Sequence, residues 1–292
     1  AIDLYDSVEY ADEIFRVNAK SAYANLVTEA VFQEDVKLCR KFILKWKVKG
    51  ETHYAFAVQM CMQYDSVKTM KFLARNKEEE LVNYRGNVEI QDIKLKSLRK
   101  KETTTTKFPL MFYAVDVGQL ERGEVAGELF KDNIVIMGFL GERFGDQTWE
   151  DKYFTPLNSK VAGRANPDMF GVVVHANIAA MILNEDYIDE LADWQLYTIA
   201  FLGCLLTVAL FIVIDNKMPM WFDALSVMIQ IIELLVFSLL IIEAFALWSL
   251  KLDLSVLLAA SAFVGPCYDF FKSGQNEVNK RLTKRRERVL TQ

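Results

Sequence analysis

The order of apolar and polar positions divides the chain into a mixed first part and an apolar last part. Between Val36 and Val48, apolar residues share one face and four lysines share the other, so this segment predicts a strand with one buried face. The patterns that follow predict a turn at 49–51, a helix from residue 52 or 53, a strand at 80–85 and a polar loop or hairpin at 87–107. After these, they predict a helical segment at 109–130 and a strand covered on both faces at 133–139. A strand at 170–175 and a helix at 176–193 complete this part. Strands that alternate with helices favour an α/β domain built from a sheet and helices.

Three long apolar segments follow at 194–214, 224–250 and 254–271. The stretch from Gln195 to Ile214 carries no charge, and twenty helical residues span about 30 Å of hydrocarbon. We therefore predict a sheet-plus-helices domain at 1–190, a three-helix transmembrane bundle at 194–271 and a basic tail at 272–292.

The composition agrees with such a divided molecule. Hydrophobic residues make up 52% of the chain, which is high for a soluble protein, while 25% charged residues is high for a chain that lies wholly in a membrane. Seven lysines and arginines against two glutamates in the tail predict a cytoplasmic C-terminus, so three crossings place residues 1–190 outside the cytoplasm. The basic cluster adjoins the bilayer and the formal net charge is -5, which argues against a nucleic-acid partner.

The sequence contains no recognisable motif for catalysis, metal binding or nucleotide binding. Its two histidines, His53 and His175, have no cysteine or second histidine at zinc-ligand spacing, and no nucleophile motif accompanies them. The glycines at 138, 141 and 145 fit neither the Rossmann nor the Walker spacing. We therefore expect no cofactor, no metal and no catalytic residue. Cys39 and Cys61 leave two roles open, a disulfide outside the cytoplasm or two small buried side chains.

Four motifs occur in a fixed order ahead of the apolar segments. They are "LVNYRGN" at 81–87, "LFKDNIVIMGFLGERFGDQ" at 129–147, "YFTPL" at 153–157 and "FGVVVHANIAAMILNEDYIDEL" at 170–191. With the three apolar segments, these motifs resemble the second type of CHASE domain over residues 15–271. CHASE domains of this type are sensory modules on the outer side of bacterial cyclases and histidine kinases. The resemblance implies a periplasmic sensory domain that takes part in signal transduction, followed by three helices in the bacterial cytoplasmic (inner) membrane.

The chain departs from this family pattern at both ends. Family members usually carry an N-terminal membrane helix and an opening strand–helix portion, so we expect part of the domain to lie upstream of Ala1. They also continue into a cytoplasmic enzyme, whereas this sequence ends in a short basic tail. We favour a non-catalytic signal-relay or accessory subunit of a cell-envelope complex. The alternatives are the receptor part of a cyclase, histidine kinase or Ser/Thr kinase whose output domain is absent from this chain, and a structural assembly protein with a degenerate sensory pocket.

A small signal molecule is expected where strands end, because ligands of α/β sheets gather at the carboxyl ends of the strands. The residues predicted to bind it are Asn83, Tyr84, Arg85, Asp146, Thr155 and His175. The alternative is a structural role, in which Arg85 and Asp146 pair with each other.

His175 stands at a predicted strand-to-helix turn. We expect it to form a hydrogen bond across this turn and to cap the following helix together with Asn177. Contact with a ligand, pH sensing and catalysis are the alternatives.

Two glutamates lie in the second apolar segment. Glu233 is fifteen residues from Trp248, near mid-bilayer, where a carboxylate is costly, and Glu243 is close enough to Trp248 to reach the interface. We expect Glu233 to be protonated, bonded to Gln230 or Thr207, or paired with another chain. Both glutamates are predicted contacts for other membrane or envelope proteins, with neutral packing and a proton or ion path as alternatives for Glu233.

Overall fold

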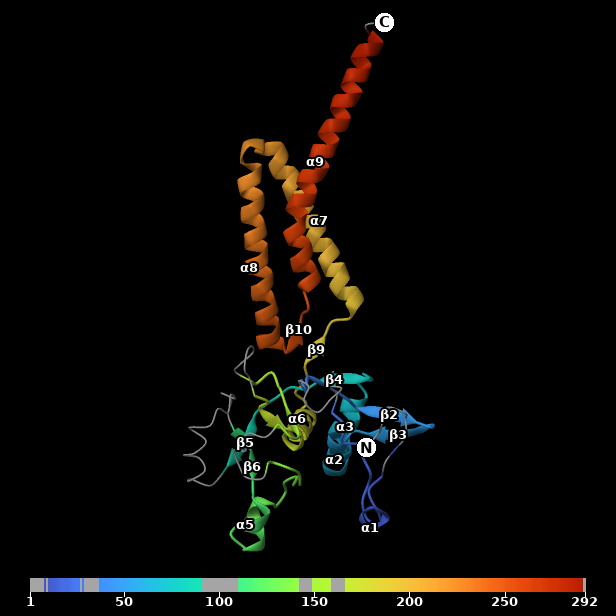
Figure 1. Ribbon diagram of the computed structural model, residues 1–292, viewed down its shortest axis with the longest axis vertical. Helices are drawn as coiled ribbons and strands as arrows, with labels where there is room; N and C mark the ends of the chain where they lie inside the picture. The colour runs from blue at the N-terminus through green and yellow to red at the C-terminus, as the bar shows by residue number, and fades with distance from the viewer. Residues whose placement is uncertain are drawn as a thin grey trace. The chain divides into compact units, whose positions relative to one another are not determined.

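The computed structural model describes residues 8, 10–26, 28, 37–90, 110–141, 149–158 and 166–290 (Figure 1). The chain divides into two compact units, Ala1–Ile188 and Asp189–Gln292. Strands and helices mix in the first unit, and the second consists mainly of long helices.

The elements of the first unit are short. They are, in chain order, α1 (Glu13–Arg16), β1 (Lys41–Ile43), β2 (Lys45–Val48), β3 (Glu51–Tyr54), α2 (Phe56–Tyr64), α3 (Ser66–Leu73), β4 (Glu79–Leu81), β5 (Asn87–Ile90), β6 (Leu110–Ala114), α5 (Val117–Glu121), the 3-10 helix η1 (Gly127–Leu129), β7 (Lys152–Tyr153), β8 (Met169–Phe170) and α6 (Gly171–Asn184). Antiparallel pairs form between β1 and β4, β2 and β3, and β7 and β8, while β5 and β6 pair parallel. The predicted mixture of helix and strand is confirmed, and within the described ranges the strands form two-stranded pairs.

A tight hairpin joins β2 to β3. Lys49 and Gly50 form its two-residue loop, with φ angles of 50° and 89°. Positive φ at both positions gives the twist that a two-residue hairpin loop requires, and glycine adopts it without strain. Because β3 takes up residues 51–54, the helix predicted from residue 52 or 53 begins later, at Phe56.

Helix α6 lies in the core of the first unit, where it packs against α2 and α3. Its residues Val174, Ile178 and Met181 are fully or almost fully buried and recur three or four positions apart, which is the spacing of one helical face. The strand predicted at 170–175 is therefore wrong, because β8 ends at Phe170 and α6 begins at the next residue. A short run of β-branched residues favours a strand locally, but it has the same apolar pattern as a buried helix.

The strand predicted at 133–139 is also wrong, because these residues have no strand assignment. Ile134 and Ile136 are half-buried, while Val135 and Met137 are 57% and 84% exposed. Side chains alternate between two faces in an extended segment, so only one face of this one packs against the protein. The apolar run predicted cover on both faces, but a sequence pattern does not specify which neighbours are present.

The helical segment predicted at 109–130 is wrong in its first part. Residues 110–114 form β6, which pairs with β5. Helix α5 starts only after Asp116, whose side chain accepts a hydrogen bond from the Gly118 amide and caps the helix. The pairing with β5 comes from a distant part of the sequence, so the local pattern around 110 did not reveal it.

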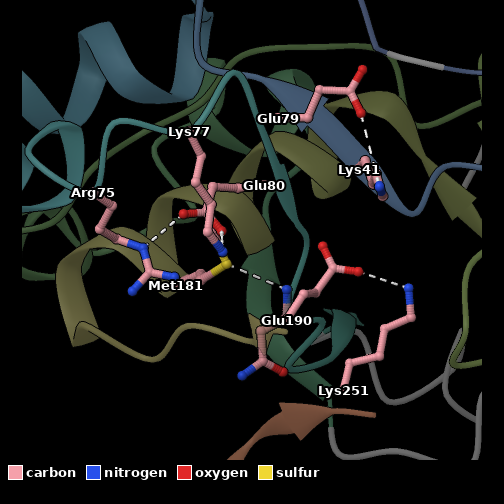
Figure 2. Close-up of polar contacts among 9 residues, drawn as sticks. Lys41, Arg75, Lys77, Glu79, Glu80, Met181, Glu190 and Lys251 are labelled. Carbon is pink, nitrogen blue, oxygen red and sulfur yellow. Dashed lines mark hydrogen bonds and ion pairs between the residues drawn. The ribbon is translucent and has the colours of Figure 1, made fainter. Parts of the chain in front are cut away.

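The second unit contains β9 (Asp189–Glu190), α7 (Asp193–Lys217), the 3-10 helix η2 (Pro219–Trp221), α8 (Phe222–Trp248), β10 (Leu250–Lys251) and α9 (Ser255–Leu290). Strand β9 pairs parallel with β10, and Lys251 Nζ lies 2.8 Å from Glu190 Oε1 (Figure 2). This pairing brings the start of α7 and the end of α8 together, so the two helices run in opposite directions. Helix α9 packs against both of them.

Two of these helices have the length and hydropathy of membrane spans. The most apolar stretches within residues 193–217 and 219–248 have mean hydropathies of 2.5 and 2.6, and only 17% and 6% of these stretches are buried. The core helix of a soluble protein would be mostly buried, so the exposed apolar surface favours contact with lipid. Helix α9 is long enough to cross a membrane but is not among these candidate spans; its first half is apolar and its second half is basic.

Candidate functional site

Asn177 of helix α6 holds the segment that carries Arg85, one of the predicted ligand-binding residues. The Asn177 side chain is fully buried, and its Oδ1 atom accepts hydrogen bonds from the amides of Arg85 (2.8 Å) and Gly86 (3.3 Å). Its Nδ2 group donates to the carbonyl oxygens of Gly86 (3.0 Å) and Val173 (2.9 Å). Both amide hydrogens and the acceptor oxygen are used, so Asn177 joins the segment after β4 to the centre of α6.

Asn83, Tyr84 and Arg85 each hold a different part of the first unit. Asn83 Nδ2 donates to the carbonyl oxygen of Asp186 (3.2 Å), and the Arg85 guanidinium forms an ion pair with the carboxylate of the same residue. Tyr84 Oη donates to the carbonyl oxygen of Cys39 (2.8 Å), and burial raises the pKa of this phenol well above its usual value. The three side chains therefore tie the motif to the residues just before β1 and to those just after α6.

The alternative in which Arg85 pairs with Asp146 falls outside the described residues, because Asp146 is not among them. Among the described residues, Arg85 pairs with Asp186. The Nε atom of Arg85 is buried without a hydrogen-bond partner among the described residues. Asp186 was missed in the sequence, although it lies in the same motif as His175 and carries the charge opposite to that of Arg85.

Thr155 is bonded twice to Asp168. Its amide donates to Oδ1 (2.9 Å) and its hydroxyl donates to Oδ2 (2.6 Å) of this carboxylate. Burial raises the pKa of Asp168, and the hydrogen bonds from Thr155 and Asn158 act in the opposite direction. Asn87 Nδ2 also donates to the Asp168 carbonyl oxygen (2.8 Å). Asp168, which the sequence did not single out, thus joins the "YFTPL" motif to β5.

His175 lies in the second turn of α6, so the prediction that it forms a strand-to-helix turn and caps the helix with Asn177 is wrong. The helix begins four residues earlier, at Gly171. His175 Nε2 lies 3.2 Å from the carbonyl oxygen of Ala24, and the ring meets Phe56 edge-on at 5.3 Å between centroids. Burial lowers the pKa of His175 to about 4. The imidazole is neutral at physiological pH, which argues against pH sensing near neutrality.

Two lysines of α3 hold the end of α6. Lys68 Nζ donates to the carbonyl oxygen of Leu183 (2.7 Å), and Lys71 forms an ion pair with Glu185. Glu185 follows the helix with a φ angle of 54°. Cations interact favourably with the free carbonyl groups at the C-terminus of a helix, so this pairing agrees with the helix dipole.

A buried carboxylate is paired with two cations that follow α3. Glu80 of β4 is 1% exposed and accepts from Arg75 Nε (2.7 Å) and Lys77 Nζ (3.3 Å). Figure 2 shows these three side chains pointing toward one another. The Arg75 guanidinium also lies over the ring of Tyr187, at 4.6 Å from its centroid. Arg75 therefore connects β4 to the residues that follow α6. The arrangement satisfies a buried charge and contacts an aromatic ring, and it is structural rather than catalytic.

Among the described residues, no group of three or more His, Cys, Asp or Glu side chains has the geometry of a metal site. Cys39 and Cys61 are both buried free thiols, which agrees with the packing alternative and not with a disulfide. Five of the six predicted ligand residues use their side chains in contacts within the unit, namely Asn83, Tyr84, Arg85, Thr155 and His175. These hydrogen bonds and ion pairs hold separate segments of the first unit against α6, the helix that precedes β9 and α7.

A scan against protein families matches residues 10–214 to the CHASE2 domain, over more than half of the chain. The chain belongs to the CHASE2 family. CHASE2 is an extracytoplasmic sensory domain of signalling proteins, so the resemblance found in the four motifs is confirmed. Searches of curated proteins and of solved structures found no match.

The matched range of CHASE2 ends within α7, so it includes Thr207 and stops before Glu233 and Glu243 of α8. Thr207 Oγ1 on α7 is 2.7 Å from Glu233 Oε1, which is one of the contacts expected for this glutamate. Glu243, nearer the other end of α8, is exposed. The two glutamates therefore lie in different surroundings, one against a neighbouring helix and one on the surface of the unit.

Gln230 of α8 compensates for a proline in α9. Pro266 lacks an amide hydrogen, so the carbonyl group of Ala262, four residues earlier, has no helical donor. Gln230 Nε2 lies 3.3 Å from that carbonyl oxygen and 2.8 Å from the carbonyl oxygen of Ser261. A Cβ atom at Gly265 would come within 3.0 Å of the Gln230 amide group, so glycine permits the approach. The sequence showed the Gly-Pro pair but not this donor.

Proposed function

We propose that this CHASE2 protein is a non-catalytic, multi-pass membrane protein that acts as a signal-relay or accessory subunit of a cell-envelope complex. The family match carries the proposal, because CHASE2 is a sensory domain and not itself a catalytic one. The contacts around Asn177 support the relay role. They fasten the segment after β4 to α6, and the chain passes from α6 through β9 into α7, a candidate membrane span. A change in the sensory unit would reach α7 along this covalent path.

Other membrane or envelope proteins are the proposed partners. Helices α7 and α8 expose many large apolar side chains, which suit lipid or the helices of other proteins. Of the two glutamates predicted as partner contacts, Glu243 is exposed and is the one that we propose to face a partner. A polar side chain on an apolar helix surface is stabilised when another chain supplies a hydrogen-bond donor.

The test is purification of the tagged full chain from native membranes in mild detergent. We expect envelope proteins to co-purify in fixed ratio, and Glu243→Gln to reduce their recovery. Glu277→Gln, an exposed change in the tail, is the matched control and should leave recovery unchanged. A chain that migrates as a lone monomer, with no difference between the variants, would contradict the proposed accessory role.

For the topology, we propose spans at 194–214, 224–250 and 254–271, with residues 1–190 in the periplasm and the tail in the cytoplasm. The first two segments coincide with the candidate spans. The third is supported by Gln230, because carbonyl groups freed by a proline need an internal donor where no water is available. Lys272, which follows the apolar first half of α9, forms an ion pair with Asp215 near the end of α7, so the charges that border these two apolar segments are matched.

Reporter fusions distinguish three spans from two. We expect a reporter placed after Lys217 to be cytoplasmic, one after Leu252 periplasmic and one after Gln292 cytoplasmic. If the reporters after Leu252 and Gln292 lie on the same side, α9 does not cross the membrane and the third span is wrong.

The alternative, a receptor part of a signalling enzyme, is favoured by one observation. Helix α9 continues without a break from its apolar first half to Leu290, so it connects the helical unit directly to the basic tail. The same helix would transmit a signal to a cyclase or kinase domain. Size determination of the native protein, with cyclase and kinase assays of the purified material, distinguishes this alternative from an accessory subunit.

A further inference from the structure

Thr207 connects α7 to a carboxyl group on α8. Its hydroxyl oxygen lies 2.7 Å from Glu233 Oε1 and 3.1 Å from the carbonyl oxygen of Gly203, and its side chain is almost fully buried. A threonine hydroxyl has one proton and cannot donate it fully to two acceptors. Within a helix, the carbonyl group four residues earlier is the usual acceptor, here that of Gly203. Both contacts can be hydrogen bonds at the same time only when the Thr207 hydroxyl donates to Gly203 and the Glu233 carboxyl group donates to Thr207.

The surroundings of Glu233 favour a neutral carboxyl group. It lies eleven residues after Phe222 and fifteen before Trp248, about 16 Å and about 22 Å along the helix axis. Its second oxygen is buried without a hydrogen-bond partner among the described residues. Cys204 is the titratable side chain of α7 that interacts with it electrostatically.

No cation lies in the apolar sequences around Glu233. Residues 194–214, 224–250 and 254–271 contain no Lys, Arg or His, and the first charged residue of α9 is Asp269. If Glu233 were ionised, its negative charge would be balanced by no cation and would receive at most one hydrogen bond, from the Thr207 hydroxyl that also contacts Gly203. An uncompensated charge inside a bilayer is far less favourable than the neutral acid.

We propose that Glu233 is a proton-binding site inside the helical unit. Its carboxyl O–H group donates to Thr207 Oγ1, and the Thr207 O–H group donates to the carbonyl oxygen of Gly203. The Glu233 carboxyl group and the Thr207 hydroxyl then each donate their one proton, and Glu233 carries no charge among the apolar segments. The site concerns the packing of α7 on α8, so it holds whether or not the sensory role proposed above is correct.

Infrared spectroscopy of the full chain in lipid bilayers at neutral pH tests the proposal. A protonated carboxyl group gives a carbonyl stretching band apart from the carboxylate bands, and the band shifts in D2O. We expect this band in the wild type, its loss in Glu233→Gln and its retention in Glu243→Gln. Glutamine keeps an N–H donor for Thr207, so the Glu233→Gln variant should fold.

A second variant keeps the test decisive if Glu233→Gln does not fold. Thr207→Val has nearly the same shape but removes the acceptor, so the carbonyl band should move to higher frequency while remaining present at neutral pH. The proposal is overturned if the wild-type band is absent, with the Glu233→Gln difference appearing in the carboxylate bands instead. It is also overturned if Thr207→Val leaves the frequency of the band unchanged.

Discussion

Asn177 is the residue on which the contacts around α6 depend. A leucine would fill a similar volume, but the asparagine bonds with the amides of Arg85 and Gly86 and with the carbonyl group of Gly86. Unsatisfied buried groups of this kind each cost about 1–3 kcal/mol. The residue therefore stabilises the NYRG motif from a distance of more than ninety residues along the chain.

Replacing Asn177 by alanine should destabilise the first unit by about 2–4 kcal/mol, because three backbone groups lose their partner and a cavity remains. Hydrogen exchange and thermal unfolding of the full chain in detergent measure the effect, with faster exchange at Arg85 and Gly86. Asn184→Ala on the same helix is the matched control. Asn184 is exposed and bonds only to the Ala180 carbonyl oxygen, so its loss should change stability by less than about 0.5 kcal/mol. Equal effects of the two substitutions would contradict the assigned role.

His175 makes the stability of the first unit depend on pH. Its pKa in the folded protein is about 4, below the ordinary 6.5, because burial disfavours the charged form. A depressed pKa means that the unfolded chain takes up the proton first. The stabilising contribution is therefore complete above pH 6.5 and is lost as pH falls from 6.5 towards 4.

We expect the stability difference between the wild type and His175→Gln to shrink by about 3 kcal/mol when pH falls from 7 to 4. Denaturant unfolding of the full chain at several pH values measures this difference. Other buried acids, such as Asp151 and Asp168, titrate in both proteins and cancel in the comparison. Parallel pH profiles for the two proteins would show that His175 does not titrate as a buried group.

At the scale of elements, the contact between α8 and α9 depends on a backbone feature. Pro266 leaves a carbonyl group without its helical donor, and Gln230 of the neighbouring helix supplies one. Gln230 and Pro266 are therefore linked through the Ala262 carbonyl group, and no sequence pattern indicates this link. Such a pair makes a specific prediction about coupling.

Gln230→Leu should destabilise the helical unit by about 1–2 kcal/mol, because the Ala262 carbonyl group loses its donor. Pro266→Ala restores the helical amide, so in the Gln230→Leu background it should recover about 1 kcal/mol. Unfolding of the full chain in bicelles on titration with a denaturing detergent measures all four members of this double-mutant cycle. Strictly additive effects would show that Gln230 does not act on the proline-freed carbonyl group.

Elements also show where the sequence patterns were insufficient. The period-two pattern at 36–48 predicted one strand with a buried face. Phe42, Leu44 and Val48 are buried, but the described part of this range is divided into β1, which pairs with β4, and β2, which pairs with β3. The run "FGVVVH" predicted a strand but forms the first turns of α6. Both interpretations used local periodicity, which decides between helix and strand only when the run is long. Burial at Val174, Ile178 and Met181 shows the helical period once the whole of α6 is considered.

At the scale of the whole molecule, the protein combines a CHASE2 unit of mixed secondary structure with a helical unit. The contacts within each unit account for most of its buried polar groups. In the first unit, Asp168, Asp186 and Asn177 connect the family motifs to one another. In the second, Thr207 and Gln230 connect the helices. Both units thus use a few buried polar side chains to fix which segments are neighbours.

The sequence by itself determined the features that depend on local composition. These are the two apolar helices that meet the requirements of a membrane span, the turn at Lys49 and Gly50, and the four ordered motifs that identify the CHASE2 family. Only the tertiary structure decided that α6 is a helix from Gly171 and that Arg85 pairs with Asp186. It also decided that Gln230 donates to the carbonyl group that Pro266 leaves without a helical donor. The physical reason is range. Hydropathy and backbone propensity act between neighbours in the sequence, whereas the partners of a buried hydrogen bond or ion pair are often far apart in the chain, as Arg85 and Asp186 are.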